Sequence, residues 1–292
     1  MTQWPRAEHV SRPGSRRSVI EGLGILKIVG IGPGLPDQLT ERARGAIRTA
    51  DAVYAAPLYR ELLAQDGLLS GAGATDGPEV LNSSRRDFEA QARQTFERVE
   101  AGETVVHVSG GDPTVYGKSD LLVALAETDA QGEIPIEVIP GVTAALAGAA
   151  ALGAPLSNDF STISLSTSRR EQAEIDRKLE AATAAGFVIA LYNCWRSLDG
   201  ALETIREHRA DSVPVALLAD VGRGDQGRAA DGETVTVSTL GEAAEKLSPE
   251  TPGTLAIVGT EDSQVLRPAG GGRPFLVTPR GDETDMQAFD LQ

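Results

Sequence analysis

The chain has 292 residues, 41% of them hydrophobic and 4% aromatic, and a net charge of -15. The acidic balance argues against nucleic-acid binding, which depends on basic residues that displace counterions. No apolar run reaches the roughly 20 residues of a membrane span, and one cysteine with three scattered histidines favours neither disulfides nor a metal site. The length favours two domains, and we expect a cytoplasmic protein.

The first part of the chain shows the alternation of strands and helices that is typical of an α/β fold. Residues 1–23 are polar and aperiodic, and we expect a disordered extension there. An N-terminal α/β domain is expected over residues 24–140. Its predicted strands are 25–31, 52–55, 104–108 and 134–139, and its predicted helices are 37–50 and 117–128.

The second part continues the pattern, and we expect a C-terminal α/β domain over residues 141–262. The predicted helices are 141–152, 171–185 and 198–209, and the predicted strands are 162–166, 187–192, 214–219, 233–237 and 254–258. Two segments fall outside the pattern: the glycine-rich stretch 66–78 and the tail 263–292. Their composition predicts loops, with a flexible tail.

Glycine-rich turns directly follow two of the predicted strands. The first reads GIGPG over residues 30–34, and the second reads SGGDPTVYG over residues 109–117. Glycine allows a sharp turn and lets a ligand approach the main chain. Ligands of open α/β sheets bind outside the carboxyl ends of the strands, so the two turns predict a common crevice. A purely structural role for either turn is the alternative.

Two polar residues near these turns are open to two interpretations each. Asp112 either caps the following helix or holds a cationic or hydroxyl-bearing ligand. Thr143 follows the Pro140–Gly141 pair and either caps the small-residue helix or lines a ligand cavity. Spacing alone does not choose between these roles.

Four motifs in this order resemble the tetrapyrrole methylase family: GIGPG, SGGDPTVYG, VIPGVTAALAGAAALGAPLSNDFSTISLS and FVIALYN. The resemblance covers about residues 25–260. It implies two α/β domains with S-adenosylmethionine in the cleft between them, in a homodimer. The stretch 141–166 and the sequence ALYN at 190–193 favour the branch that methylates carbon 17 of precorrin-3B, or of cobalt-precorrin-3, with ring contraction, in cobalamin biosynthesis.

The resemblance also implies a set of site residues, carried over motif by motif. Cofactor contacts are expected at Pro33, Gly110, Gly111, Asp112, Val115, Thr143, Ala144, Tyr192, Asn193, Gly222, Val258 and Gly259. Substrate contacts are expected at Gly32, Tyr59, Arg85 and Tyr116. Family members often carry glycine where this chain has Thr114 and asparagine where it has Thr260, and no catalytic acid or base is assigned.

The carboxylate rim of a precorrin calls for basic partners, and arginine forks suit carboxylates. Candidate arginines are Arg60, Arg85, Arg86, Arg169, Arg170 and Arg196, and a solvated surface charge is the alternative for each. His107 lies in an apolar strand and is expected to be buried and structural. Cys194 is expected to be a structural thiol rather than a reactive one.

Three other functions compete with this hypothesis. A sister methylase would act at another precorrin carbon. An NAD-dependent dehydrogenase would explain the first glycine turn, but it needs an acidic residue at the end of the strand 52–55 to hold the ribose, and none stands there. A non-catalytic tetrapyrrole carrier would have no use for S-adenosylhomocysteine.

Overall fold

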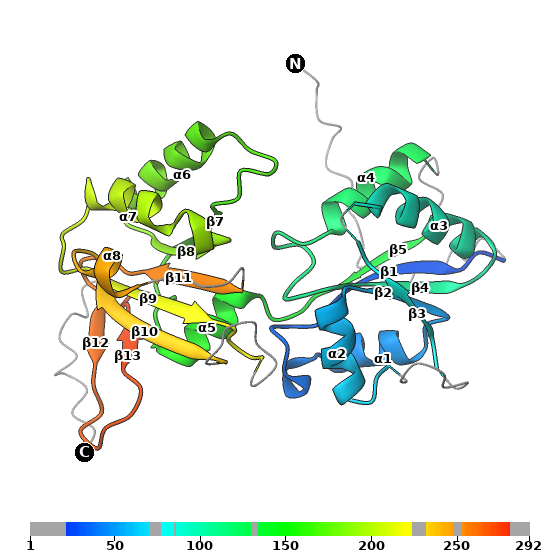
Figure 1. Cartoon of the computed structure of the whole chain (residues 1–292), viewed down its shortest axis with the longest axis horizontal. Helices are drawn as coiled ribbons and strands as arrows, with labels where there is room; N and C mark the ends of the chain where they lie inside the picture. Colours follow the sequence, from blue (N-terminus) through cyan, green and yellow to red (C-terminus); the bar gives the residue numbers. More distant parts are fainter. Residues whose placement is uncertain are drawn as a thin grey trace.

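The protein consists of two α/β domains, each built on its own five-stranded sheet (Figure 1). The expectation of two such domains is confirmed. No helix within the described part of the chain has the length and apolar character needed to cross a membrane. The computed structural model describes residues 22–69, 77–84, 86–129, 134–223, 232–247 and 253–280.

The first sheet is entirely parallel, with strand order β3-β2-β4-β1-β5. Neighbouring residues of its central strands pack on opposite faces, because side chains alternate along a strand. Val29 and Val106 belong to the core on one face, and Ile28 and Val105 to the core on the other. The strands are β1 (Ile25–Gly30), β2 (Ala52–Ala55), β3 (Glu79–Asn82), β4 (Thr104–Ser109) and β5 (Ile136–Ile139).

Helices cover both faces of this sheet, α1 and α2 on one side and α3 and α4 on the other (Figure 1). The predicted helix 37–50 is divided, because Leu39 and Thr40 are extended. The Thr40 side chain then accepts a hydrogen bond from Ala43 N and caps α1. The helices are η1 (Pro36–Gln38), α1 (Glu41–Arg48), α2 (Pro57–Gln65), α3 (Phe88–Glu100) and α4 (Ser119–Asp129).

The second sheet is mixed, with strand order β10-β9-β11-β8-β7. Only β7 and β8 are parallel, and β11 runs antiparallel to both of its neighbours, β8 and β9. The strands are β7 (Phe160–Ser164), β8 (Val188–Tyr192), β9 (Pro214–Ala219), β10 (Thr234–Thr239) and β11 (Thr254–Val258). The helices are α5 (Ala144–Leu152), α6 (Gln172–Ala184), η2 (Cys194–Arg196), α7 (Leu198–Arg206) and α8 (Ala243–Lys246).

Helix α5 is the connection between the domains, and it packs on the second sheet. A Cβ atom on Gly148 would lie 2.8 Å from the Leu255 side chain, so glycine permits a close approach between the helix and β11. The other face of the sheet packs on α6, α7 and α8. Helix α5 therefore carries the chain from the carboxyl end of β5 directly into the core of the second domain.

The part of the tail that the structure describes is ordered into strands, which differs from the loops expected there. Strand β13 pairs with β12 and with a two-residue strand at the end of α5, and Leu276 on β13 is fully buried. The tail is ordered because β13 pairs with strands of the second domain, and its composition gives no sign of this pairing. The strands are β6 (Gly153–Ala154), β12 (Gln264–Leu266) and β13 (Phe275–Val277). The expected extension lies almost wholly outside the described residues, as do the end of the tail, 281–292, and most of the 66–78 stretch.

Candidate functional site

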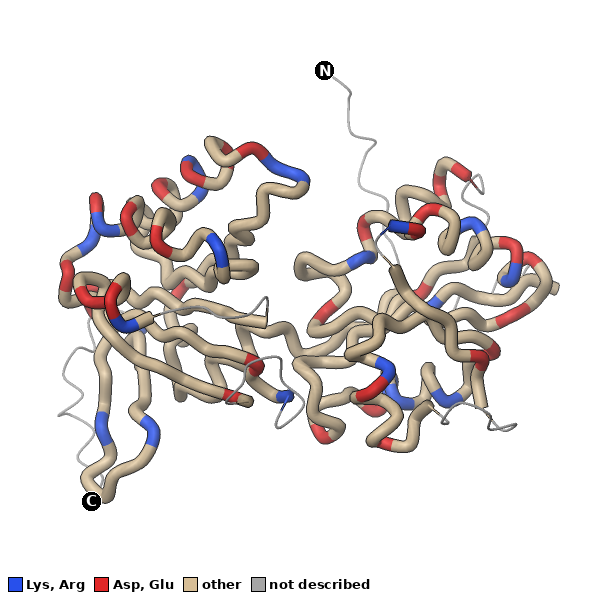
Figure 2. Tube along the Cα trace, in the orientation of Figure 1, with Lys and Arg blue, Asp and Glu red and all other residues tan. Residues whose placement is uncertain are grey.

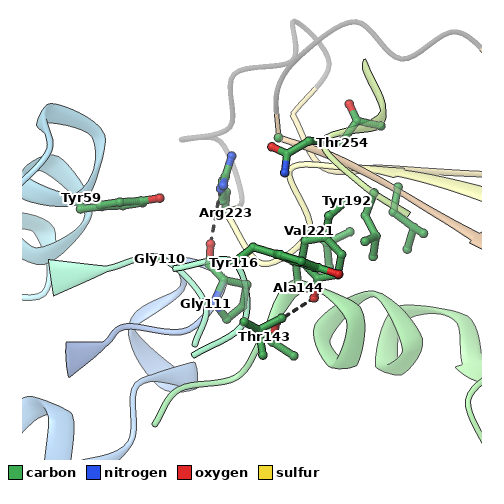
Figure 3. Close-up of a pocket in the computed structure, with 16 residues that line it drawn as sticks. Tyr59, Gly110, Gly111, Tyr116, Thr143, Ala144, Tyr192, Val221, Arg223 and Thr254 are labelled. Carbon is green, nitrogen blue, oxygen red and sulfur yellow. Dashed lines mark hydrogen bonds between the residues drawn. The ribbon is translucent and has the colours of Figure 1, made fainter. Parts of the chain in front are cut away.

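A pocket opens where the strand ends of the two sheets face each other (Figure 3). The first domain contributes the two glycine turns and two tyrosines, and the second domain contributes the ends of β8 and β9 and the beginnings of α5 and β11. The lining residues are Pro33, Tyr59, Gly110, Gly111, Val115, Tyr116, Thr143, Ala144, Tyr192, Asn193, Leu218, Val221, Arg223, Gly253, Thr254 and Leu255.

The two glycine turns are bonded to each other. Gly32 N donates to Gly111 O at 3.1 Å, and Gly111 N donates to Gly32 O at 2.7 Å. Both residues have left-handed backbones, with φ of 70° for Gly32 and 68° for Gly111, which other residues adopt only with strain. Gly32 is thereby placed behind Gly111, as a support of the pocket wall.

Asp112 ties the second turn to the start of the next segment. Its side chain is buried, and both carboxylate oxygens accept hydrogen bonds from inside the protein. Oδ1 accepts from Thr114 N at 2.8 Å, and Oδ2 accepts from Gly141 N at 3.1 Å. The carboxylate does not cap α4, which begins at Ser119, and it does not line the pocket. Its role in this structure is to hold the turn.

Gly141 and Gly30 make this arrangement possible, because three strand ends meet there without side chains. A Cβ atom on Gly30 would lie 2.7 Å from both Gly111 O and Gly141 N. A Cβ atom on Gly141 would overlap the Gly111 carbonyl and lie 2.8 Å from the Gly30 carbonyl carbon. The close packing of main chains, rather than ligand contact, explains why glycine is needed at these positions.

Gly110 is glycine because a tyrosine lies against it. A Cβ atom at this position would overlap the Tyr59 hydroxyl and lie 2.6 Å from its Cζ. Tyr59 belongs to α2, and its ring reaches across the pocket wall toward the second domain (Figure 3). Tyr59 is thus brought to the pocket, as expected for a substrate contact.

Tyr192, at the end of β8, holds the start of α5. Its hydroxyl accepts from Ala145 N at 2.8 Å and is 2.7 Å from Thr143 Oγ1. The N-cap residue of this helix, Thr143, makes no side-chain capping bond. The tyrosine hydroxyl instead accepts a hydrogen bond from one of the free amide groups of the first turn. The Tyr192 hydroxyl is protonated at neutral pH in any case, and burial raises its pKa further.

Two residues with left-handed backbones flank Tyr192. Asn193 has φ of 55°, and its Nδ2 donates to Ser164 Oγ at 2.9 Å. Tyr116 has φ of 54°, and its hydroxyl donates to Thr162 O at 2.7 Å, so it joins the β4–α4 loop to the second domain. The rings of Tyr116 and Tyr192 are 5.0 Å apart. Strained conformations of this kind concentrate at functional sites.

The end of β9 contacts the first glycine turn on the other side of the pocket. Leu35 N donates to Gly222 O at 2.5 Å, and Arg223 Nε donates to Pro33 O at 3.4 Å. The Arg223 guanidinium is also paired with the buried carboxylate of Asp220 at 2.5 Å. Gly222 itself lies behind the wall, where a Cβ atom would collide with Pro33, while its neighbours Val221 and Arg223 line the pocket.

Val258 and Gly259 are not brought to this pocket. Strand β11 is antiparallel to β8 and β9, so its beginning, rather than its end, lies beside their carboxyl ends. Val258 is fully buried in the sheet. Gly259 N donates to Pro214 O at 2.9 Å, and Gly259 O accepts from the buried Arg209. The assignment was carried over from the family motif, and the antiparallel direction of β11 places both residues at the end of the strand away from the pocket.

Residues at the beginning of β11 take the place of Val258 and Gly259 in the wall. Gly253, Thr254 and Leu255 line the pocket, as do Leu218 and Val221 near the end of β9, and none of these was predicted. Ligands of open α/β sheets bind outside the carboxyl ends of strands, and this rule, applied to β9, would have predicted Leu218 and Val221. No sequence signal shows that β11 is reversed.

The candidate arginines are spread over several surroundings. Arg60 donates to Asn82 Oδ1 at 3.4 Å, and Arg196 lies 3.9 Å from the ring centre of Trp195. Arg169 pairs with Asp120 at 3.9 Å. Arg86 is exposed, and Arg85 lies outside the described residues. None of those described lines the pocket, so their role as carboxylate contacts stays a prediction.

His107 and Cys194, which were expected to be structural, are both buried. His107 stacks on Tyr54, with ring centres 4.5 Å apart, and its Nε2 is 2.7 Å from Thr95 Oγ1. Burial, with a smaller contribution from Lys118, lowers the pKa of His107 to about 3. Cys194 is completely buried, and burial raises the pKa of its thiol to about 12. Neither group is ionised at neutral pH. Among the described residues, no cluster of His, Cys, Asp and Glu is arranged to hold a metal ion.

Solved structures with this fold include methyltransferases. A crystal structure described as the methyltransferase CobJ aligns with a TM-score of 0.72 and 25% identity, covering 88% of this chain and all of that one. A uroporphyrin-III C-methyltransferase from Thermus thermophilus, complexed with S-adenosyl homocysteine, aligns with a TM-score of 0.60 and 24% identity. That alignment covers 81% of this chain and 97% of that one, and it shows the fold alone.

Curated relatives give the same result at higher identity. A precorrin-3B C(17)-methyltransferase from Sinorhizobium sp is 34% identical, over 88% of this chain and 96% of the relative. A probable cobalt-factor III C(17)-methyltransferase from Methanothermobacter thermautotrophicus is 34% identical, over 84% of this chain and 67% of the relative. Residues 26–244 match the family described as Tetrapyrrole (Corrin/Porphyrin) Methylases. The chain therefore belongs to the tetrapyrrole methylase family.

Proposed function

We propose that this protein methylates carbon 17 of precorrin-3B, or of its cobalt form, with ring contraction, and that S-adenosylmethionine is the methyl donor. The similarity to named carbon-17 methyltransferases along nearly the whole chain supports the choice of substrate. The observation that carries the proposal is the pocket itself. Its glycine turns and the ends of β8 and β9 face one another from two domains.

The pocket wall fits the donor in chemical character. Exposed main chain at Gly110 and Gly111 offers polar groups without bulk, and Val115, Leu218 and Leu255 offer apolar surface for a heteroaromatic ring. The cationic side chain in the wall, Arg223, is neutralised by Asp220, so it does not repel a sulfonium. The faces of Tyr116 and Tyr192 suit a cation.

The contribution of the chain to the reaction is positioning and exclusion of water. S-adenosylmethionine supplies an electrophilic methyl group, which an electron-rich pyrrolic carbon attacks in line. Tyr59 and Tyr116 present flat surfaces at the pocket, where the substrate ring would meet the donor. Such placement accounts for large rate gains without a covalent nucleophile. The buried and protonated state of Cys194 agrees with this chemistry.

The decisive experiment uses S-adenosylmethionine with a ¹³C-labelled methyl group. The protein is incubated with precorrin-3B and, separately, with the cobalt form, and the labelled carbon is located by NMR. A methyl group on carbon 17 of a contracted ring is expected. A methyl group at another position would identify a sister methylase, and failure to bind S-adenosylhomocysteine would contradict donor use and favour a carrier.

A matched pair of glycine variants connects this activity to the pocket. Gly111→Ala and Gly186→Ala both force alanine into a left-handed backbone, with φ of 68° and 77°. Each should lose about 1 kcal/mol of stability from that strain. Only Gly111 lines the pocket, so only Gly111→Ala should reduce the methylation rate, by tenfold or more. Equal rates for the two variants would place the donor elsewhere.

The dehydrogenase alternative finds no support in the structure. Strand β2 ends at Ala55 and is followed by Ala56 and Pro57, so the ribose-binding carboxylate is absent from its end. The homodimer implied by the family resemblance remains part of the proposal, and light scattering of the purified protein measures it. The cytoplasmic location also remains a prediction.

A further inference from the structure

The loop between β7 and α6 carries two adjacent arginines, Arg169 and Arg170, with different surroundings. The loop extends toward the first domain across the gap between the sheets (Figure 1), and its tip is basic (Figure 2). Arg169 is 61% exposed and lies 3.9 Å from the Asp120 carboxylate. Arg170 is partly buried, with its guanidinium carbon 5.7 Å from the ring centre of Tyr116.

The Tyr116 ring is a fixed platform for Arg170. Its backbone is left-handed, its hydroxyl is bonded to Thr162 O, and its ring contacts Tyr192. A guanidinium within about 6 Å of an aromatic ring gains cation–π attraction. The same ring lines the pocket, so the arginine stands one side chain away from it.

The guanidinium of Arg170 forms no ion pair within the described part of the chain, and its charge acts on Glu174 only as one of the lesser causes that lower the pKa of that carboxyl. No carboxylate there comes within ion-pair distance of its guanidinium, and none of the hydrogen bonds found there uses its donors. Glu174, one helical turn further on, is bonded to Lys178 Nζ at 2.6 Å instead. A guanidinium offers five N–H donors in a planar fork that matches a carboxylate.

We propose that Arg170, held over the Tyr116 ring at the edge of the pocket, binds a peripheral carboxylate of the tetrapyrrole. This role rests on the proposed function for its substrate, which carries acetate and propionate groups around a flat ring. Arg170 is therefore a specificity-determining residue, while the neighbouring Arg169 forms only a weak, exposed ion pair with Asp120. The carboxylate of the methyl donor is the other source of the same chemistry, and binding measurements separate the two.

The test compares Arg170→Gln, Arg170→Lys and Arg169→Gln with the unaltered protein. Arg170→Gln should raise the KM for precorrin-3B about tenfold, while the Kd for S-adenosylhomocysteine changes less than twofold. Arg170→Lys should recover part of the loss, since it restores the charge without the fork. Arg169→Gln should behave like the unaltered protein. Equal effects of Arg170→Gln and Arg169→Gln would overturn the assignment, and a tenfold rise in the Kd for S-adenosylhomocysteine would transfer Arg170 to the donor.

A binding measurement with uroporphyrin III separates this proposal from the proposed function. This stable tetrapyrrole carries eight carboxylates, and quenching of its fluorescence reports its Kd without any turnover. Arg170→Gln should weaken its binding about tenfold relative to Arg169→Gln. Should the unaltered protein not methylate precorrin-3B, this difference would still support Arg170 as a carboxylate contact. Equal binding to the two variants would overturn it.

Discussion

The two domains contribute to the pocket in different ways. The parallel sheet of the first domain supplies exposed main chain, since the turns after β1 and β4 are rich in glycine and are bonded to each other through Gly32 and Gly111. The mixed sheet of the second domain supplies side chains, among them Tyr192 and Arg223. A ligand between them would meet glycine backbone together with the rings of Tyr59 and Tyr116 on the first domain's side, and mainly side chains on the second domain's side. Substitution by alanine is therefore expected to be most damaging at glycines of the first domain.

The largest effect that tests this contrast is expected for Gly141→Ala. The new Cβ atom would overlap the Gly111 carbonyl and press on Gly30, all of it main chain that cannot move aside. We expect a loss of about 3 kcal/mol of unfolding free energy and no binding of S-adenosylhomocysteine. Denaturant unfolding and calorimetric titration measure the two quantities.

The control for this variant is Gly45→Ala. Gly45 lies within helix α1, and a Cβ atom there would meet nothing within 4 Å. Alanine should stabilise that helix by up to about 1 kcal/mol. If Gly141→Ala were as well tolerated as Gly45→Ala, the close packing of main chain between Gly141 and the glycines of the first domain would be disproved.

A smaller effect distinguishes the domains by their response to acid. His107 in the first domain has its pKa lowered to about 3, so the folded state stays neutral while the unfolded state takes up a proton below pH 6.5. The contribution of neutral His107 to the free energy of unfolding is intact above pH 6.5 and is lost progressively as the pH falls toward 3. At pH 5 the loss is about 2 kcal/mol. His107→Gln should remove this dependence, and replacement of the exposed His208 should leave it in place when unfolding is followed at pH 5 and pH 7.

The smallest of the three effects is a response of the second domain to alkali. The pKa of Cys194 is raised to about 12, so the unfolded thiol ionises above pH 9 while the folded one does not. Stability is unaffected below pH 9 and falls between pH 9 and pH 12. About 1.4 kcal/mol is lost at pH 10. Unfolding of Cys194→Ala at pH 7 and pH 10 should lack this term, and an unchanged slope would assign the alkaline loss to other groups.

Most strands could be predicted from the sequence, because buried strands of an α/β fold read as apolar runs. Val188–Tyr192 and Thr254–Val258 are clear cases. Helix Pro57–Gln65 was missed, and so were two elements with weaker patterns. Strand Glu79–Asn82 lies at a sheet edge with no fully buried residue, and helix Phe88–Glu100 is mostly polar. Pairing and tertiary packing, rather than local pattern, form these two elements.

The candidate site was predictable to a similar degree, although Asp112 and Gly222 lie behind the pocket wall and Val258 and Gly259 lie away from it. Glycine-rich turns after parallel strands can be recognised in the sequence. Four of the residues predicted in or near such turns line the pocket: Pro33, Gly111, Thr143 and Asn193. The direction of a strand leaves no mark in its composition, so the reversal of β11 could not be foreseen. The residues expected at its far end are therefore distant from the ends of β8 and β9.

The pair of hydrogen bonds between Gly32 and Gly111 has a consequence for how this protein can be recombined. Each glycine completes the bonding of the other, across nearly eighty positions of sequence. Transplanting only one of the two turns from a relative would leave the pair mismatched. A chimera should retain activity when both turns come from the same parent, so the two turns have to be exchanged together.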